Sequence, residues 1–141
     1  MKKNITCYFP YIDETLSCKI TAELSQCQNV NHIYFLSVTE TDKTLAPNSS
    51  IIKVGSIEDT DTWNTLVKLN NTDYILICTQ AREIELGYMA LQRMIDYLET
   101  SNAAMAYADR YQIKEGRREA HPVCDYQMGS VRDDFDFGPL L

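Results

Sequence analysis

Polar residues that could bind a ligand follow four predicted strands of the chain. They are Tyr11 to Asp13, Thr39 to Asp42, Ser56 to Thr60 and Thr79 to Glu83. If the strands are parallel, these loops meet at one edge of the sheet, where ligands of open α/β folds bind. The sequence therefore predicts a cleft there that could hold a nucleotide. The alternative is that these are ordinary connecting loops, because polar loops follow strands in every α/β protein.

Acidic side chains near the C-terminus form a second group with possible chemistry. Asp133, Asp134 and Asp136 could hold a metal ion, although such a run is more often solvated. Asp109 directly follows a predicted strand, so it is better placed for a functional role. A lone aspartate there is also often a turn or cap residue.

Neither the two histidines nor a search for known catalytic motifs identifies an active site. His121 could act as a base, but Pro122 follows it and favours a place at the end of a hairpin. His32 precedes a strand and is expected to be structural. The chain contains no GxGxxG, GxxxxGK[ST], GxSxG or HExxH pattern, and these absences argue against a dinucleotide dehydrogenase, a P-loop NTPase and an α/β hydrolase.

Hydrophobic patterning predicts an α/β protein: a three-layer sandwich with a mostly parallel central sheet. Tyr74–Cys78 is a continuous apolar run, typical of a strand that is buried on both faces. With the helix and the apolar strand that follow it, this run predicts a βαβ unit in which Tyr74–Cys78 is an inner strand of the sheet. The chain is expected to be one domain, 1–141, in which 110–141 form a hairpin and an irregular tail. The predicted helices lie near 14–27, 61–68 and 86–99, and the predicted strands are Ile5–Phe9, Ile33–Val38, Ile51–Val54, Tyr74–Cys78 and Ala104–Tyr107.

Composition narrows the partners and the compartment. The net charge of −7 argues against nucleic acid or an anionic membrane surface as a partner. The five cysteines include no CxxC pair, which predicts neither a zinc site nor a disulfide framework and favours the reducing cytosol. We expect no signal peptide and no transmembrane segment, because no apolar run approaches about 20 residues. A cytoplasmic protein is expected, with a peripheral place at the inner membrane as an alternative.

The last residues, FDFGPLL, are unusually apolar for a chain end. This pattern predicts a segment cut from a longer protein, a tail that folds back over the sheet, or both. Exposed Phe and Leu side chains should find cover on the sheet or on a second copy, so a homodimer is a further expectation.

Several pieces, taken in order, resemble the N-terminal part of family 2 glycosyltransferases, nucleotide-diphospho-sugar transferases with the GT-A fold. The most specific match is to a bacterial subgroup typical of Bacteroidetes, through MAYADR and the tail HPVCDYQMGSVRDDFDFG. The pieces are Ile5 to Tyr11 (ITCYFPY), His32 to Asp42 (HIYFLSVTETD), Asp73 to Leu86 with the following Gly87-Tyr88, Met105 to Arg110 and His121 to Gly138.

The resemblance implies a cleft that binds a nucleotide-diphosphate sugar. In the family, a DxD motif holds Mg²⁺ or Mn²⁺ against the diphosphate, and a later carboxylate is the catalytic base. Here the DxD position reads Thr79-Gln80-Ala81, and the paired acids usual after the second strand read Ser37-Val38. No metal ligand and no catalytic residue are therefore assigned, the cofactor is left open, and the base is expected beyond residue 141.

The implied function is the donor-binding part of a glycosyltransferase that transfers a sugar to an unknown acceptor. The alternative is a non-catalytic, degenerate module that binds a sugar nucleotide or a protein partner. We expect weak, nearly metal-independent binding of uridine or guanosine diphosphate, and no turnover by this chain alone. The residues expected to line the nucleotide-sugar site are Pro10, Tyr11, Asp13, Thr39, Glu40, Asp59, Thr79, Gln80 and Asp109.

Overall fold

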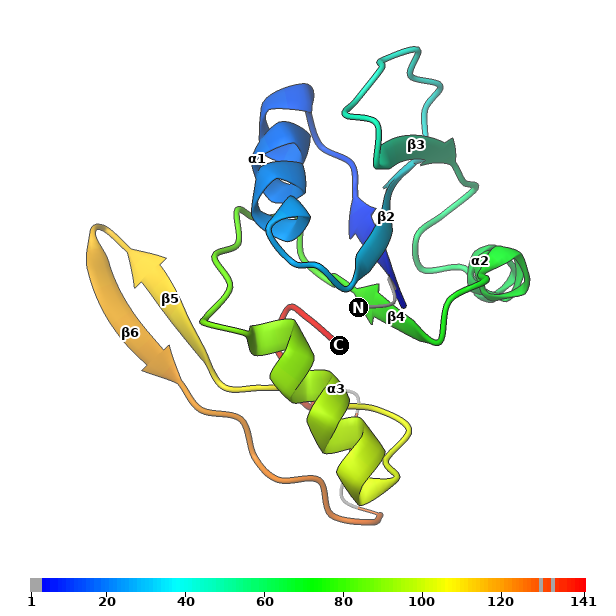
Figure 1. Cartoon of the computed structure of the whole chain (residues 1–141). Coiled ribbons are helices and arrows are strands. Elements are labelled where there is room, and N and C mark those ends of the chain that lie inside the picture. Colours follow the sequence, from blue (N-terminus) through cyan, green and yellow to red (C-terminus); the bar gives the residue numbers. More distant parts are fainter. Residues whose placement is uncertain (1–3, 130, 133) are drawn as a thin grey trace.

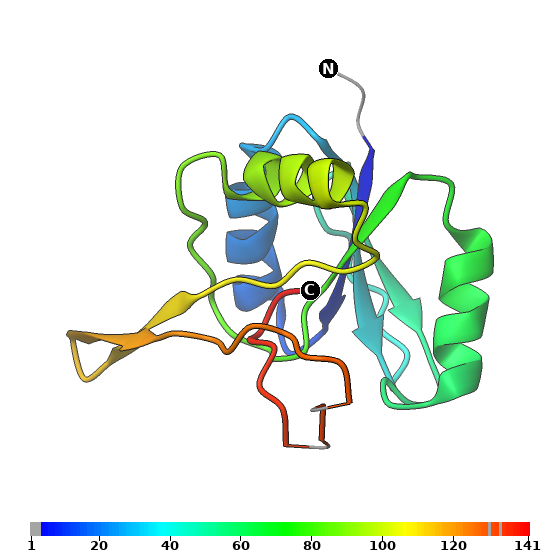
Figure 2. The same cartoon turned by 90° about the horizontal axis from the view of Figure 1, so that it is seen from below.

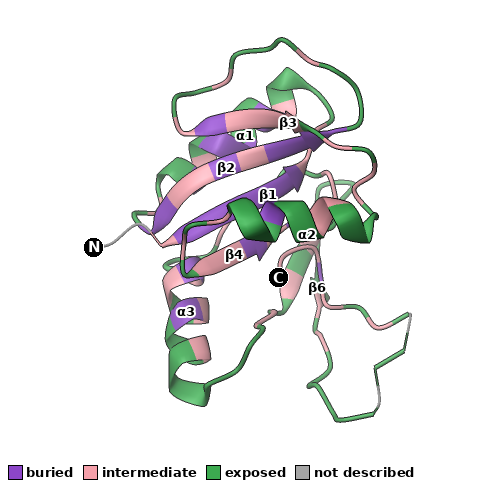
Figure 3. Cartoon of the chain, turned by 90° about the vertical axis from the view of Figure 1, so that its right-hand side faces the viewer, coloured by how far each residue is buried: buried purple, intermediate pink, exposed green. Residues whose placement is uncertain are grey.

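The computed structural model describes residues 4–129, 131, 132 and 134–141. Its centre is an all-parallel sheet of four strands in the order β3-β2-β1-β4. Figures 1 and 3 show the sheet from two sides. The strands are β1 (Ile5–Pro10), β2 (Val30–Ser37), β3 (Ser49–Lys53) and β4 (Tyr74–Ile77).

Helices and a separate hairpin complete the chain. Figure 2 shows α1 and α3 on one side of the sheet and α2 on the other, so the α/β three-layer arrangement is confirmed. Among the described residues, no helix is long and apolar enough to cross a membrane. The elements are α1 (Glu14–Ser25), α2 (Thr60–Leu69), α3 (Ala90–Ser101), β5 (Arg110–Lys114) and β6 (Arg117–His121).

Alternation along β1 divides the core between the two faces of the sheet. Cys7 and Phe9 lie in the cluster that α1 and α3 cover, with Ile20 of α1 and Ile95 of α3. Tyr8 points to the other face and packs in the cluster that contains Leu66 of α2. Because successive side chains of a strand point to opposite faces, a continuous apolar run is what a sheet covered on both sides requires.

Capping residues fix the starts of α1 and α2. Asp13 accepts a hydrogen bond from the Leu16 N–H over 2.8 Å, and Asp59 accepts from the Asp61 N–H over 3.3 Å. Both bonds satisfy N–H groups that have no partner inside the helix. The expected starts of these two helices are confirmed.

Helix α3 begins four residues later than expected, at Ala90 instead of residue 86. Met89 has a φ of 50°, in the left-handed region, and the Ala90 N–H donates to Gly87 O over 3.0 Å. A tight turn therefore precedes the helix, and Met89 is its N-cap residue, not part of its first turn.

The predicted strand Ala104–Tyr107 is wrong: the segment has no regular structure and is largely exposed. Tyr107 is held by side-chain contacts, since its ring meets the rings of Phe135 and Phe137 edge-on and its hydroxyl donates to Cys124 O over 2.8 Å. The expected βαβ unit therefore lacks its second strand.

Strand β4 is consequently the edge of the four-stranded sheet, not an inner strand as predicted. The C-terminal tail, residues 134–141, covers part of this edge. Ile77 and Leu141 exchange backbone hydrogen bonds of 2.8 and 3.0 Å, and Cys78 forms an antiparallel bridge with Leu140. The prediction that the tail folds back on the sheet is confirmed, and the tail takes the place expected for the fifth strand.

The predicted hairpin is confirmed as β5 and β6, which pair only with each other. Its turn residues Glu115 and Gly116 both have positive φ, 50° and 75°. Positive φ at both central residues is the requirement of the two-residue turn that matches the twist of a hairpin, and glycine meets it without strain.

Candidate functional site

The carboxyl ends of β1 and β4 lie side by side at the point where the strand order reverses. From β1 the chain proceeds outward through β2 to β3, and then returns to β4 on the other side of β1. In open α/β sheets a ligand binds in the crevice at such a reversal. Tyr11 follows β1 here and Thr79 follows shortly after β4, so two of the predicted site residues are brought to this point.

Residues after β1 mainly support the local fold. Pro10 is the last residue of β1 and is in register with Leu36 of β2, and the Tyr11 N–H donates to Leu36 O over 2.8 Å. Asp13 caps α1 through its side chain. The half-buried Tyr11 side chain also packs against the core.

Residues after β2 and β3 form exposed loops at the same edge. The buried Ser37 hydroxyl donates to Thr39 O over 2.9 Å, which fixes the turn out of β2. The Glu40 carboxylate forms an ion pair with Lys53 at 3.3 Å, and Asp59 caps α2. The Glu40 side chain is 84% exposed, so it is accessible to a ligand.

The segment after β4 is occupied by the tail. The Thr79 N–H donates to Pro139 O over 2.9 Å, and the Thr79 hydroxyl donates to Gly138 O over 3.3 Å. The Cys78 thiol donates to Gln80 O over 2.8 Å, and burial raises the pKa of that thiol, which keeps the proton on sulfur. Thr79, which the sequence resemblance places where a metal motif would be expected, thus holds the tail through its backbone N–H.

Asp109 directly precedes β5 and belongs to the hairpin. Its carboxylate accepts a hydrogen bond from the Val123 N–H over 2.8 Å and closes the base of the hairpin. Its predicted place at the end of a strand is wrong, because Ala104–Tyr107 is not a strand. This contact agrees with the alternative interpretation, in which Asp109 is a turn or cap residue.

Arg110 is the residue that the sequence reasoning missed. Its guanidinium donates from Nη2 to Asp136 Oδ2 over 2.9 Å, while Nη1 is buried without a hydrogen-bond partner in the described part of the chain. The Gly138 N–H donates to the other oxygen of Asp136 over 2.8 Å. Hydrogen bonds from Arg110 and then Gly138 hold the pKa of Asp136 below its ordinary value. Asp136 thus holds the C-terminal tail in place in this arrangement. Asp133, which was also considered as a metal ligand, lies outside the described residues.

Carboxylates gather on the three loops that follow β1, β2 and β3. Lys43 pairs with Glu14 at 2.6 Å and Lys53 with Glu40 at 3.3 Å. In the described residues Asp42 has no cationic partner, and no group of three or more His, Cys, Asp or Glu side chains converges as a metal site would require. We call this surface the acidic rim, which comprises Asp13, Glu14, Glu40, Asp42, Glu58, Asp59 and Asp61.

A polar hollow of about 160 Å³ lies at the opposite, amino-terminal end of the strands. Thr6, His32 and Tyr34 line it together with the segment before β4. The His32 Nε2 atom lies 2.8 Å from Ser50 Oγ, and burial lowers the pKa of the ring. His32 therefore has the structural role expected for it.

The chain matches no protein-family model, no curated protein and no solved structure. What the structure shows is a four-stranded parallel sheet with helices on both faces, compatible with a Rossmann-like α/β fold. The narrower GT-A assignment stays a prediction.

Proposed function

We propose that this chain is a glycosyltransferase-like, donor-binding domain that binds a nucleotide-diphosphate sugar without transferring the sugar by itself. The observation that carries the proposal is the reversal of strand order between β1 and β4, with Tyr11 and Thr79 at the two carboxyl ends. This is the position at which open parallel sheets bind nucleotides.

In the proposed complex the base and ribose lie over the loops after β1 to β3. Tyr11 offers a half-buried side chain, and the Glu40 and Asp59 carboxylates would accept hydrogen bonds from ribose hydroxyls or base N–H groups. The diphosphate lies nearer Thr79, on the side away from most of the acidic rim. Carboxylates repel phosphates, so this orientation is the electrostatically favoured one.

Affinity in this complex is expected to be low. The loop after β4 carries no carboxylate at Thr79-Gln80-Ala81 to hold a bridging cation. The tail also binds the Thr79 N–H that could otherwise meet a phosphate oxygen. We therefore expect a dissociation constant on the order of 0.1–1 mM, which corresponds to about −4 to −5.5 kcal/mol.

Titration calorimetry with uridine and guanosine diphosphates, with and without Mn²⁺, tests this proposal. We expect weak binding of one of them that Mn²⁺ changes by less than about threefold, that is, by less than about 0.7 kcal/mol. A large gain with Mn²⁺ would show that an unassigned carboxylate holds the ion. Absence of binding to both nucleotides at several millimolar would overturn the proposal.

A matched pair of variants locates the site. Glu40→Gln on the acidic rim should weaken nucleotide binding by about 3- to 10-fold, which is the loss of one hydrogen bond to a ligand. Glu119→Gln on the hairpin makes the same charge change and should leave the affinity unchanged. Equal effects of the two variants would exclude the acidic rim as the place where the nucleotide binds.

A further inference from the structure

The β5–β6 hairpin presents an apolar face to solvent. Tyr111 and Ile113 lie on the same face and are 65% and 69% exposed. The register places Ala120 opposite Tyr111 and Arg118 opposite Ile113, so the two β6 residues share that face. The Arg118 guanidinium lies over the Tyr111 ring, 4.7 Å from its centroid.

The hairpin receives little cover from the rest of the chain. Figures 1 and 2 show it projecting from the body of the molecule. It forms its own two-stranded sheet, and most of its strand residues are exposed. An isolated two-stranded hairpin is marginally stable in water, and packing against another element is what normally stabilises it.

The charge of the hairpin is opposite to that of the body. Residues 110–121 contain four Lys or Arg and two Asp or Glu residues, a net charge of +2. The remainder of the chain must then carry −9, because the whole chain carries −7. Lys114 and Arg117 flank the turn and are both exposed, so the positive charge extends to the tip of the hairpin.

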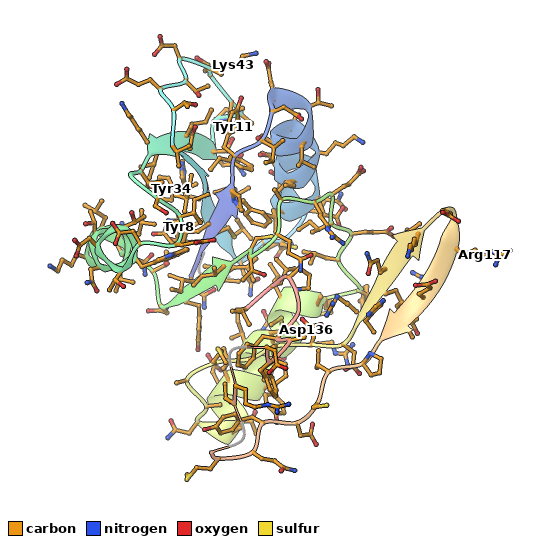
Figure 4. The ribbon with its side chains drawn as sticks, turned by 180° about the vertical axis from the view of Figure 1, so that it is seen from behind. Tyr8, Tyr11, Tyr34, Lys43, Arg117 and Asp136 are labelled. Carbon is orange, nitrogen blue, oxygen red and sulfur yellow. The ribbon has the colours of Figure 1, made fainter. Side chains whose placement is uncertain are left out.

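The acidic rim has the complementary composition. Ile12 and Val38 lie beside its carboxylates and are 60% and 57% exposed. The rim thus combines apolar side chains with negative charge, as the hairpin combines apolar side chains with positive charge. In Figure 4 Arg117 lies at the tip of the hairpin, well away from Tyr11 and Lys43 at the rim of the same molecule.

We propose that the hairpin of one copy of this chain docks on the acidic rim of a second copy. Tyr111 and Ile113 cover Ile12 and Val38, and Arg118 on the same face meets carboxylates that have no lysine partner. Lys114 and Arg117 lie on the other face and add positive charge at the edge of the contact, beside the turn. We infer a second copy as the partner for two reasons. The two surfaces have opposite charges, and they lie too far apart in one molecule to contact each other. Because the two surfaces differ, the contact is heterologous, and it closes into a ring or pair only if the geometry permits.

Sedimentation velocity over a concentration series tests the proposal on the whole chain. We expect self-association at about 0.05 M salt that weakens at least about tenfold at about 0.5 M salt, because salt screens exposed charges. A single monomeric species at up to about 1 mM protein in low salt would overturn the proposal.

Two charge-reversed variants identify the surfaces. The hairpin variant, Lys114→Glu with Arg117→Glu, spares the Arg118–Tyr111 contact. The rim variant, Asp42→Lys with Glu58→Lys, changes carboxylates that have no cationic partner among the described residues. Each variant alone should associate much more weakly, because the hairpin of the first becomes negative and the rim of the second loses most of its negative charge. An equimolar mixture should associate again, because the unchanged hairpin of the rim variant can then dock on the unchanged rim of the hairpin variant.

A control pair makes the same change of charge as the hairpin variant, at a different place on the chain. Lys68→Glu with Arg93→Glu alters exposed residues of α2 and α3, and should associate like the unchanged chain apart from a small effect of the net charge. Circular dichroism of each variant confirms that it is folded. Association that survives both the hairpin and the rim reversal, or a mixture that stays monomeric, would overturn the assignment of these two surfaces.

Discussion

The Arg110 guanidinium donates to the Asp136 carboxylate over 2.9 Å and so joins the first residue of the hairpin to the tail. The same carboxylate accepts the Gly138 N–H, one residue before the backbone contact of Pro139 with Thr79. Gly138 is buried with a φ of 83°, and a Cβ there would lie 3.4 Å from Arg110 Nη1. This contact network therefore fixes the path by which the tail reaches β4.

Asp136→Asn should reduce stability at neutral pH by up to about 1 kcal/mol, the upper range for an exposed ion pair. The pKa of Asp136 is depressed in the folded chain, mainly by Arg110. Its contribution is thus complete above the ordinary aspartate pKa, about 3.9, and is lost as pH falls through the folded value. Urea unfolding at pH 7 and near pH 3 measures this. The stability difference from wild type should shrink at acid pH, and Asp125→Asn serves as the exposed control.

The region around β4 explains where sequence reasoning succeeded and where it failed. Apolar patterning found β1 to β4, the three helices and the hairpin, since these depend on local spacing and caps such as Asp13. It failed at Ala104–Tyr107, because an apolar run can be buried in two ways that look alike in sequence. Its backbone can pair with a neighbouring strand, or its side chains can pack against other side chains, as the Tyr107 ring packs against Phe137. The edge of β4 was instead covered by Leu140 and Leu141, more than 60 residues away in sequence.

Leu140→Ala should lower the free energy of unfolding by about 1–2 kcal/mol, somewhat less than for a fully buried leucine. Leu140 is half-buried and packs against the cluster beneath α1 and α3. Chemical denaturation measures the change, with Met128→Ala as the control because that side chain is 93% exposed. Equal stabilities of the two variants would contradict the docking of the tail on the sheet.

The candidate site was predicted less well than the fold. Tyr11 and Thr79 were correctly placed at one edge of the sheet because each follows a strand. The carboxyl ends of parallel strands lie at the same edge. Residue type alone did not decide between a ligand-binding and a structural role for three aspartates: Asp13 and Asp59 cap helices, and Asp109 closes the hairpin base. Arg110 and Asp136 are 26 residues apart, and no local pattern signals such a pair.

Thiol labelling should separate the cysteines by exposure. Cys18 and Cys124 are exposed and should react with iodoacetamide at pH 8, whereas Cys7 and Cys78 should react at least about 100-fold more slowly. Burial raises the pKa of both buried thiols, so little thiolate is present at that pH. Mass spectrometry of the labelled peptides reports each site, and unfolding in urea should remove the difference.

No sugar-transfer turnover is expected from this chain alone. The described residues offer no converged metal site, and a missing general base typically costs about 10²–10⁴ in rate. Release of nucleoside diphosphate across a panel of sugar nucleotides and simple acceptors measures this. Sustained release that Asp109→Asn abolishes would show a complete site within the chain. Such a result would contradict the hydrogen bond to Val123 as the main role of Asp109.

Nucleotide binding and self-association should oppose each other, because both proposals place their ligand on the acidic rim. A bound nucleotide that excludes the hairpin of a second copy weakens self-association. Because this coupling is reciprocal, self-association weakens nucleotide binding by the same factor. At a nucleotide concentration of ten times its dissociation constant, the apparent association constant should fall about tenfold. Sedimentation velocity with saturating uridine or guanosine diphosphate measures the fall. Glu40→Gln, which weakens nucleotide binding, should require more nucleotide for the same effect. If saturating nucleotide leaves self-association unchanged, the two ligands occupy different surfaces, and one of the two assignments to the acidic rim is wrong.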